Sequence, residues 1–506
     1  MTITKKPTVM IILDGFGYTP ESHGNAIFHA HKPHFDLFLK NYPHTLLHAS
    51  GNAVGLPEKT VGNSEVGHLT LGAGRTIQQP LTRLSQEFLQ GTLQTNPILT
   101  SSFEHLKKTK TALHLMGLVS DGNVHSSLEH FFGFLALAQN HTLPKVFIHC
   151  FLDGRDVAPQ SAHHYLTQLD SKISELKLGS IASLHGRFYA MDRDHNWQRT
   201  QSCYETLTQK QELWFDSWHN ALEFYYNQKL YDEFIPPTQI IPTGIIKKND
   251  GILFFNLRPD RARQLTEAFT NPSFDGFQRS NLPLSFFITP ISFDDNCITT
   301  PLLTPTFIKN SLLECISKAG KTIYTTAETE KYAHVTYFFN GGKEEQWPHE
   351  KRVLIPSSPL RDYKHHPEMA APQITAHLVD SLKNDPRDFY LVNYANADMV
   401  GHSGDFNATV QAIECLDKQL AILYHEVVEK HNGTLYITAD HGNAEKKIDT
   451  YTGLPSSSHT SNQVYFITLK KGLEGTQLPT NLIGLSDCAP YILKNMEIPV
   501  PDEMKR

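Results

Sequence analysis

The chain has few cysteines and no long hydrophobic run, and these two absences narrow the class of protein. Its six cysteines are scattered over 506 residues with no Cys-x-x-Cys pair, so reduced thiols are expected rather than a disulfide framework. No stretch approaches the roughly 20 consecutive apolar residues that a membrane-spanning helix needs. We therefore expect a cytoplasmic protein without a membrane partner.

The chain also lacks a strong charge of either sign, internal repeats and low-complexity tracts. With 45 Lys and Arg against 52 Asp and Glu, its formal net charge is −7. This balance argues against a broad nucleic-acid-binding surface but leaves room for a local basic pocket that binds a small anion. The apolar share of 40% and the charged share of 19% are ordinary for a globular protein. At about 150 residues per domain, the length predicts two to four domains.

Short β-branched or aromatic runs recur along the chain, and each is followed closely by Asp, His or Arg. Asp14 follows the first run, and Asp440 and His441 follow the last. Apolar runs separated by helix-like segments indicate strands buried on both faces of parallel sheets. In such α/β folds ligands bind beyond the carboxyl ends of the strands, where these polar residues would lie. The seven runs are residues 9–13, 111–118, 146–152, 181–184, 252–255, 390–394 and 434–438.

Two segments are candidate domain boundaries. Residues 299–306 alternate threonine, leucine and proline, a composition that cannot sustain a helix and that predicts a linker. A second boundary is expected near residues 75–80, after a glycine-rich turn. Together they indicate one domain inserted into another.

Gly320-Lys321-Thr322 resembles the end of a phosphate-binding P-loop, but Cys315 stands where that motif needs glycine. The segment also follows a helix-like stretch, residues 308–318, instead of opening a helix. We therefore expect Gly320 to end that helix, with no nucleotide site there.

Three clusters late in the chain have the composition of metal ligands. Any one of them alone is more typical of a solvated loop or a hydrogen-bonded histidine. Together with an early aspartate they offer three carboxylates and three imidazoles, enough for two divalent ions. Mixed oxygen and nitrogen ligands without thiolates favour Mn²⁺ or Zn²⁺ over Ca²⁺. The candidates are Asp14, Asp398, His402, Asp440, His441 and His459.

Ser64, in residues 60–68, is the best candidate for a nucleophile. Gly62 and Gly67 let the backbone bring the serine close to a ligand, and a helix that begins there would direct N–H groups at an anion. Serine needs a base or a cation to lose its proton, and a bound metal ion would stabilise the alkoxide. The alternative is that Ser64 serves only as a helix N-cap.

Five arginines follow predicted strands in the middle of the chain. Guanidinium groups match phosphate and carboxylate oxygens in pairs, so the pattern favours a small polyanionic substrate. Lys331 could add a point charge to a phosphoryl group during transfer. The arginines are Arg155, Arg187, Arg193, Arg258 and Arg261.

Ten segments across the chain closely resemble motifs of the cofactor-independent phosphoglycerate mutases, a family within the alkaline phosphatase superfamily. Metal ligands are shared across that superfamily, whereas the central arginine-bearing motifs belong to the mutases. The segments are residues 13–17, 62–68, 120–126, 153–156, 186–193, 255–262, 327–342, 398–402, 438–445 and 459–460.

The resemblance implies an α/β fold of two domains. Residues 1–76 and 309–506 would form an alkaline-phosphatase-like, parallel-sheet phosphatase domain, and residues 77–308 an inserted α/β phosphotransferase domain. It also implies a monomer with two divalent metal ions, Mn²⁺ in the first place and Zn²⁺, Co²⁺ or Mg²⁺ as alternatives, and no 2,3-bisphosphoglycerate.

Residue roles carried over from the family complete the prediction. One ion would be held by Asp398, His402 and His459, and the other by Asp14, Ser64, Asp440 and His441. The substrate contacts would be His125, Arg155, Asp156, Arg187, Arg193, Arg258, Arg261 and Lys331.

The implied activity is the interconversion of 3-phosphoglycerate and 2-phosphoglycerate in glycolysis and gluconeogenesis. Ser64 would take the phosphoryl group, giving phosphoserine and glycerate, and Asp156 would accept a proton from the glycerate hydroxyls. Glycerate must stay sheltered between the two transfers, so domain closure is expected.

Two other functions fit parts of the sequence. A phosphomonoesterase of the same superfamily would let water relieve the phosphoserine, but a hydrolase has no need of arginines that hold the leaving alcohol. A non-catalytic metal- or anion-binding protein would lack a ligand or the nucleophile, and all seven metal positions, Ser64 among them, are present.

Overall fold

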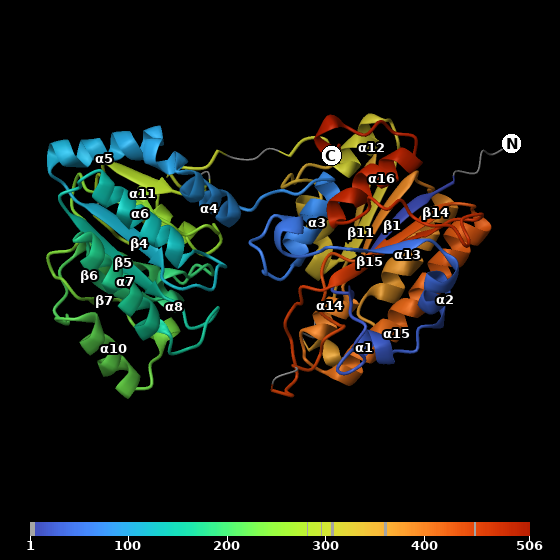
Figure 1. Cartoon of the computed structure of the whole chain (residues 1–506), viewed down its shortest axis with the longest axis horizontal. Coiled ribbons are helices and arrows are strands. Elements are labelled where there is room, and N and C mark those ends of the chain that lie inside the picture. Colours follow the sequence, from blue (N-terminus) through green and yellow to red (C-terminus); the bar gives the residue numbers. More distant parts are fainter. Residues whose placement is uncertain are drawn as a thin grey trace. The chain divides into compact units, whose positions relative to one another are not determined.

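The computed structural model describes residues 6–280, 282–294, 296–304, 308–358, 362–449 and 452–505. They form two compact α/β units (Figure 1). Unit 1 comprises Met1–Gln79 and Phe307–Arg506, and unit 2 comprises Pro80–Thr306. The predicted fold class, α/β with one unit inserted into the other, is confirmed. Within the described ranges, no helix is long and apolar enough to cross a membrane.

Unit 1 is built on an eight-stranded sheet whose central strands are parallel. The strand order is β12-β11-β13-β1-β14-β15-β2, and β3 also pairs with β15. The parallel strands are β12 (Glu350–Ile355), β11 (Ile323–Glu328), β13 (Phe389–Tyr394), β1 (Thr8–Leu13) and β14 (Thr434–Thr438). The antiparallel edge consists of β15 (Gln463–Leu469), β2 (Gly17–Tyr18) and β3 (His44–Leu47).

Two groups of helices cover the sheet of unit 1, and they lie on opposite sides of it in Figure 1. One group consists of α3 (Ser64–Ala73), α12 (Leu312–Lys318) and α16 (Cys488–Asn495). The other consists of α1 (Ala26–His29), α2 (Pro33–Asn41), α13 (Ala371–Asn384), α14 (Asn396–Gly401) and α15 (Phe406–Leu423). With both faces covered, the central strands β11, β13, β1 and β14 are buried over almost their whole length, as expected for a parallel sheet.

Unit 2 is built on a seven-stranded sheet that is parallel except at one edge. Its order is β10-β9-β8-β4-β5-β6-β7, and only the β6–β7 pair in that order is antiparallel among the described residues. The strands are β4 (Leu113–Leu118), β5 (Val146–Leu152), β6 (Ser180–Gly186), β7 (Thr238–Gln239), β8 (Gly251–Phe254), β9 (Phe286–Thr289) and β10 (Thr300–Pro301). The helices are α4 (Pro80–Gln90), α5 (Pro97–Thr109), α6 (Leu128–Asn140), α7 (Ala162–Leu176), α8 (Arg187–Ala190), α9 (Trp197–Thr208), α10 (Trp218–Asn227) and α11 (Arg263–Thr270).

The predicted strands and the rejected P-loop can be checked directly. All seven apolar runs form strands with a parallel neighbour: β1, β4, β5, β6, β8, β13 and β14. Gly320 follows α12 with φ +69° and donates its N–H to the Ser317 carbonyl at 2.9 Å. That is the left-handed glycine typical of a helix C-terminus, so Gly320 ends this helix, as predicted.

The predicted linker, residues 299–306, is wrong at its start. Thr300 and Pro301 pair with β9, and Leu302 donates its N–H to Thr289 at 2.9 Å, so the segment begins as an edge strand of unit 2. An edge position tolerates proline because one side of the strand makes no ladder hydrogen bonds. The end of the segment, residues 305 and 306, lies outside the described residues.

Candidate active site

Ser64 is the first residue of α3, and the residue before it caps the helix. The Asn63 side chain accepts a hydrogen bond from the Val66 N–H at 3.1 Å, so the interpretation of Ser64 as only an N-cap is wrong. The turn of α3 that follows lies close to the end of β14, because a Cβ on Gly67 would be 2.5 Å from the Asp440 carbonyl oxygen. Glycine at this position therefore lets the start of α3 approach the strand end.

Three side chains from the carboxyl ends of parallel strands surround the Ser64 hydroxyl. Lys331, in the short helix Thr329–Lys331 after β11, donates from Nζ to Ser64 Oγ at 2.7 Å. His441, after β14, places Nε2 3.0 Å from the same oxygen. Ser64 itself donates to Oδ1 of Asp14, after β1, at 3.2 Å. The hydroxyl therefore lies between a cation, an imidazole and a carboxylate, all of them buried.

Charges within this cluster hold one another ionised. Lys331 Nζ lies 2.7 Å from both Asp14 Oδ1 and Asp398 Oδ2. Burial alone would lower the pKa of Lys331, but these two carboxylates raise it above its usual range. Burial likewise would raise the pKa of Asp14, yet Lys331 and His441 hold it well below its usual range. For His441, burial opposes the charge while Asp440 and Asp14 favour it, and its pKa rises to about 9.

Asp398, His402 and His459 form a second cluster whose lone pairs converge. The Nε2 atoms of the two histidines are 3.0 Å apart, and each lies 3.2 Å from Asp398 Oδ1. Each Nδ1 faces a backbone carbonyl oxygen, that of Ser457 at 2.7 Å and that of Gly62 at 2.9 Å. A carbonyl only accepts, so Nδ1 carries the proton of each neutral ring and Nε2 keeps its lone pair. Two nitrogen lone pairs and a carboxylate oxygen facing one point fit a divalent cation.

The residues around Ser64 fit a cation as well. Asp14, Asp398 and His441 offer ligand atoms within 4.8 Å of one another, and so do Asp14, His68 and Asp440. Asp440 Oδ2 is buried, and no described residue donates a hydrogen bond to it, because His68 Nδ1, 3.1 Å away, faces the Ser64 carbonyl oxygen at 2.8 Å. An unsatisfied buried carboxylate oxygen is costly unless a cation or donor faces it. The structure thus brings all seven sequence-predicted metal positions together within unit 1.

Several residues in this cluster were missed by the sequence interpretation. His68 lies one turn after Ser64 on α3, and its Nδ1 is 3.1 Å from Asp440 Oδ2. The spacing of four residues on a helix is the signal that could have found it. Asn393 donates to Asp14 Oδ2, and Asn443 to Asp398 Oδ1, each at 2.8 Å. These amides orient carboxylates that lie far from them along the chain, so no spacing rule pointed to them.

In unit 2, the predicted substrate residues also lie at the carboxyl ends of parallel strands. Arg187, the first residue of α8 after β6, is 2% exposed. Its Nη1 lies 2.6 Å from Asp153 Oδ1 and 2.6 Å from Asp156 Oδ2, both after β5. Asp156, predicted as a proton acceptor, is therefore an ion-pair partner of a predicted substrate contact. Arg155 is largely exposed and lies 3.5 Å from Glu233.

Asp260 is the centre of the remaining substrate residues. Its carboxylate lies 3.2 Å from Arg193 Nη1, 3.6 Å from Arg258 Nε and 4.0 Å from His125 Nδ1. Arg261 instead donates to a backbone carbonyl oxygen, that of residue 191, at 3.2 Å. The sequence interpretation gave Asp260 no role, although it separates two of the predicted cations.

Positive charge accumulates at this edge of unit 2. Burial lowers the pKa of Arg261, and the guanidinium groups of Arg193, Arg187 and Arg155 lower it further. Burial and Arg187 together lower the pKa of His125 to about 3, so this imidazole is neutral at pH 7. Arg155, Arg193 and Arg258 reach solvent, and guanidinium groups gathered in this way fit a ligand with several negative charges. Lys331, the eighth predicted substrate contact, lies in unit 1 beside Ser64.

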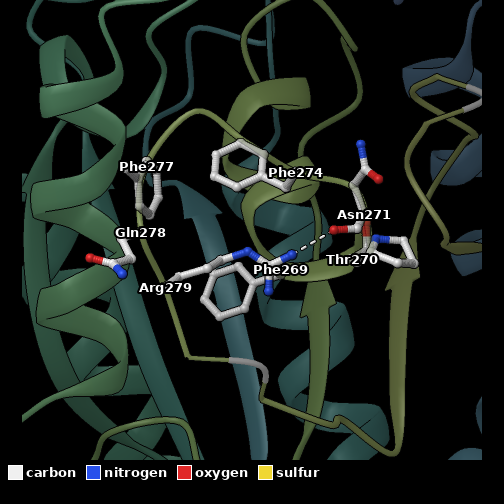
Figure 2. A pocket seen from close by; sticks show the side chains of 8 residues that line it. Phe269, Thr270, Asn271, Phe274, Phe277, Gln278 and Arg279 are labelled. Carbon is white, nitrogen blue, oxygen red and sulfur yellow. Dashed lines mark hydrogen bonds between the residues drawn. The ribbon is translucent and has the colours of Figure 1, made fainter.

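A cavity of about 420 Å³ lies elsewhere in unit 2, beside α11 (Figure 2). Phe269, Phe274 and Phe277 line it together with Arg279, which donates to the Asn271 carbonyl oxygen at 2.5 Å. None of the sequence-predicted site residues lines this cavity.

Comparisons with known proteins agree with the fold. Residues 84–295 match the family model described as "BPG-independent PGAM N-terminus". The chain is 44% identical to the 2,3-bisphosphoglycerate-independent phosphoglycerate mutase of Clostridium botulinum, over 99% of each chain. It is also 44% identical to that of Legionella pneumophila, over 98% of this chain and 96% of the other. A solved structure of Leishmania mexicana phosphoglycerate mutase, at low cobalt concentration, matches this fold with a TM-score of 0.76 and 28% sequence identity. The match covers 100% of this chain and 97% of the other.

The fold and its clustered polar residues define the class: an α/β enzyme of phosphoryl transfer whose functional groups follow parallel strands. Identity of 44% over almost the whole chain then defines the family. The chain belongs to the 2,3-bisphosphoglycerate-independent phosphoglycerate mutases, as the sequence motifs predicted.

Proposed function

We propose that the chain interconverts 3-phosphoglycerate and 2-phosphoglycerate, a step of glycolysis and gluconeogenesis, with Ser64 as the carrier of the phosphoryl group. One observation carries this assignment: the buried Ser64 Oγ lies 2.7 Å from Lys331 Nζ and 3.0 Å from His441 Nε2. A hydroxyl becomes a nucleophile when neighbouring groups accept its proton or stabilise its anion. Family membership supplies the reaction, and this geometry supports the choice of atom.

In the first transfer, Ser64 Oγ loses its proton and bonds to phosphorus while the bond from phosphorus to the C3 oxygen of 3-phosphoglycerate breaks. That oxygen takes up a proton, so the alcohol left is glycerate. The ammonium of Lys331 stabilises the charge on the phosphoryl oxygens, and the N-terminus of α3 adds its N–H groups. In the second transfer, the C2 hydroxyl of glycerate attacks the phosphoserine and Ser64 is regenerated. The serine itself carries the phosphoryl group, so no 2,3-bisphosphoglycerate is needed.

Two divalent cations complete the proposed site. One would be held by Asp398, His402 and His459, and the other by Asp14, Ser64, Asp440 and His441. When bound, they supply positive charge that stabilises the ionised hydroxyl and the transferring phosphoryl group. Nitrogen and oxygen ligands favour Mn²⁺, with Zn²⁺, Co²⁺ or Mg²⁺ as alternatives, and the Leishmania mexicana enzyme was crystallised at low cobalt concentration.

The arginine cluster of unit 2 retains glycerate between the two transfers. Arg155, Arg187, Arg193, Arg258, Arg261 and His125 bind the carboxylate and phosphate oxygens. Asp156, whose Oδ2 lies 2.6 Å from Arg187 Nη1, accepts a proton from a glycerate hydroxyl. A phosphomonoesterase would release the alcohol here, so this cluster supports the mutase over the hydrolase.

The substitution Ser64→Ala tests the assignment. We expect 2-phosphoglycerate formation to fall by about 10³-fold or more, as when a covalent nucleophile is removed. Acid quenching of the parent enzyme during turnover should trap phosphate on Ser64, detected by mass spectrometry. Ser101→Ala, at an exposed position of α5, is the matched control. Full activity of Ser64→Ala, or phosphate release in place of 2-phosphoglycerate, would reject the proposal.

We further propose that the enzyme works as a monomer in the cytoplasm, on small-molecule substrates and without a nucleic-acid or membrane partner. Soluble phosphoglycerates are its substrates, and all proposed catalytic groups belong to one chain. Light scattering after gel filtration should give the mass of one chain, 57.2 kDa, and a dimer mass would overturn this.

A further inference from the structure

A continuous row of hydrogen bonds crosses the buried core of unit 2. We call it the histidine chain: Asp250, His114, His149, Ser183 and His185, none more than 5% exposed. His114 Nε2 lies 3.1 Å from Asp250 Oδ2, and His114 Nδ1 lies 2.9 Å from His149 Nε2. Ser183 Oγ lies 2.7 Å from both His149 Nδ1 and His185 Nε2. Every member thus contacts the next.

The histidine chain runs diagonally over the sheet, from one end of the strands to the other. Asp250 directly precedes β8, and His114 is the second residue of β4. His149 is the fourth residue of β5, and His185 is the sixth of the seven residues of β6. The row therefore ends at the carboxyl edge of the sheet, two residues before Arg187.

Polar groups at these positions are costly unless they fix a specific structure. The surrounding strand positions are apolar, and a buried polar group without a partner destabilises the fold. A fully connected network instead favours a single arrangement of its strands. Apolar residues would fill the same space without needing hydrogen-bond partners. Five linked polar groups therefore indicate a role beyond filling the core.

The protons of the histidine chain can be placed by elimination. The ionised carboxylate of Asp250 only accepts, so His114 donates from Nε2 and accepts at Nδ1. His149 then donates from Nε2 and accepts at Nδ1 from Ser183, whose oxygen accepts from His185 Nε2. All three imidazoles are therefore neutral and carry their proton on Nε2. His185 Nδ1 is left as a buried acceptor with no partner in the described part of the chain.

The bond between His149 and Ser183 lies at an irregularity of strand pairing. Ile148 pairs with Ile181, but His149 pairs with Ser183, so the register between β5 and β6 shifts by one residue there. The skipped residue, Ala182, uses its carbonyl oxygen to accept from Ile240 and Ile241, at 2.8 and 3.1 Å. Beyond the shift, regular pairing continues to the strand ends.

This register decides which side chains meet beyond the strand ends. Slipping a strand by one residue turns every side chain to the other face. The ion pairs of Arg187 with Asp153 and Asp156, both at 2.6 Å, need the two strand ends at the observed alignment. Inside the sheet, the bond between His149 Nδ1 and Ser183 Oγ joins the side chains of β5 and β6 at this alignment.

We propose that the histidine chain is a positioning device for Arg187, holding β5 and β6 in register so that Asp153 and Asp156 orient its guanidinium toward the substrate. The members act through Arg187 and do not touch the reacting atoms. This inference rests on the proposed role of Arg187 as a substrate contact.

Kinetics of serine variants test the positioning role. Ser183→Ala removes the hydroxyl in the middle of the histidine chain, so Arg187 should be held less firmly. We expect the KM for 3-phosphoglycerate to rise about five- to tenfold, the order of one lost hydrogen bond, while kcat changes by less than about twofold. Ser183→Thr keeps the hydroxyl and should restore the parent KM. Ser180→Ala, on the same strand but outside the histidine chain, should leave both constants unchanged.

A second variant covers the case in which Ser183→Ala does not fold. His185→Phe keeps a ring packed near Phe151 but removes the donor at the end of the row, and it should also raise KM more than it lowers kcat. If KM stays unchanged in the folded variants Ser183→Ala and His185→Phe, the positioning role is overturned. It is also overturned if kcat falls in these variants by as large a factor as KM rises.

Nuclear magnetic resonance tests the proton placement without any use of activity. In the full chain labelled with ¹⁵N-histidine, His114, His149 and His185 should each show the neutral Nε2–H form. In Ser183→Ala, His149 and His185 should no longer be restricted to that form. An Nδ1–H form of any of the three rings in the parent would reject the histidine chain. Absence of mutase activity in the parent would reject the proposed function but leave this result standing.

Discussion

His402 and His459 turn their Nε2 atoms toward each other at 3.0 Å, while a backbone carbonyl oxygen holds the opposite nitrogen of each ring. Neither atom of the close pair carries a proton in the neutral rings, so two lone pairs face each other beside Asp398. Such an arrangement is stable only with a cation between the groups or a proton taken up by one of them. The fold therefore preorganises this pair before any ion binds.

Removal of one of these imidazoles should remove one metal ion. We expect His459→Ala to reduce bound divalent metal from about two ions to about one per chain, because a ligand set of three loses its geometry when one member is missing. Elemental analysis after gel filtration measures the ratio. His377→Ala, at an exposed position of α13, should keep two ions. Two ions retained by His459→Ala would place that site elsewhere.

Lys331 should matter most for stability when the metal is absent. Lys331→Met leaves Asp14 and Asp398 buried without their ammonium partner, and breaking a buried ion pair costs about 3–5 kcal/mol. We expect the metal-free variant to lose that much free energy of unfolding, and the variant loaded with Mn²⁺ to lose less. Urea unfolding of the two forms measures the difference.

The control for Lys331 is a lysine in a solvent-exposed ion pair. Lys318 pairs with Glu314 at 2.8 Å, with the lysine side chain 61% exposed, so Lys318→Met should cost no more than about 1 kcal/mol. Equal losses in both variants would show that Lys331 does not stabilise the buried carboxylates.

Acid should destabilise unit 2 through its buried histidines. Burial lowers the pKa of His114 and of His149, and it lowers that of His185 to about 3. Around His114, the carboxylate of Asp250 opposes this shift and Lys247 adds to it. The folded protein keeps these rings neutral, while the unfolded chain binds protons below about pH 6.5. The contribution of these rings to stability is thus complete above that pH and falls as the pH drops. For His185 the loss is about 1.4 kcal/mol per pH unit down to about pH 3, and His114 and His149 change stability in the same direction.

Tryptophan fluorescence can measure this loss in unit 2 separately. Three of the four tryptophans lie there, and Trp347→Phe removes the one in unit 1. In that background, His185→Phe should reduce the pH dependence of the unfolding free energy by the contribution of one histidine ring, about 1.4 kcal/mol per pH unit. A slope that stays the same would mean that His185 is already protonated in the folded state at these pH values.

An arginine of the substrate cluster should affect substrate affinity and leave the fold intact. Arg258→Ala should raise the KM for 3-phosphoglycerate about 10- to 100-fold, the scale of a lost hydrogen bond to a charged group. Its side chain is 42% exposed, so thermal stability should change little. Arg263→Ala provides the comparison, since Arg263 has similar exposure but pairs with Asp294 at 3.1 Å. A similar KM in the two variants would exclude Arg258 from the substrate contacts.

Local sequence patterns predicted the strands well because each buried strand is a short apolar run that ends at a polar residue. Asp14 after β1 and His441 after β14 are the clearest cases. They lie close together because β1 and β14 are neighbouring parallel strands that end at the same edge of the sheet. Where a residue takes its role from a distant partner, no local pattern exists. Asn393 and Asp14, which share a hydrogen bond, are separated by 379 positions.

The histidine chain shows the same limit. His114 and His149 lie within apolar runs, where a histidine is as compatible with simple packing as with a network. Only the pairing of β4, β5 and β6 brings them within hydrogen-bond distance. The two-residue strand at Thr300 was missed for a related reason, since proline and threonine also suit an edge strand once a partner is available.

The position of β1 in the sheet of unit 1 has a consequence for how the chain folds as it is made. β1 pairs on one side with β13 and on the other with β14, so it must wait for its first sheet partner until the roughly 380 residues between Leu13 and Tyr394 have been synthesised. At 5–20 residues per second this delay lasts about 20–80 s. Throughout that time the apolar strand β1 has no strand to pair with. Unit 2 can already fold, because all of its strands come from one uninterrupted stretch of chain. Chaperones should therefore bind nascent chains at β1.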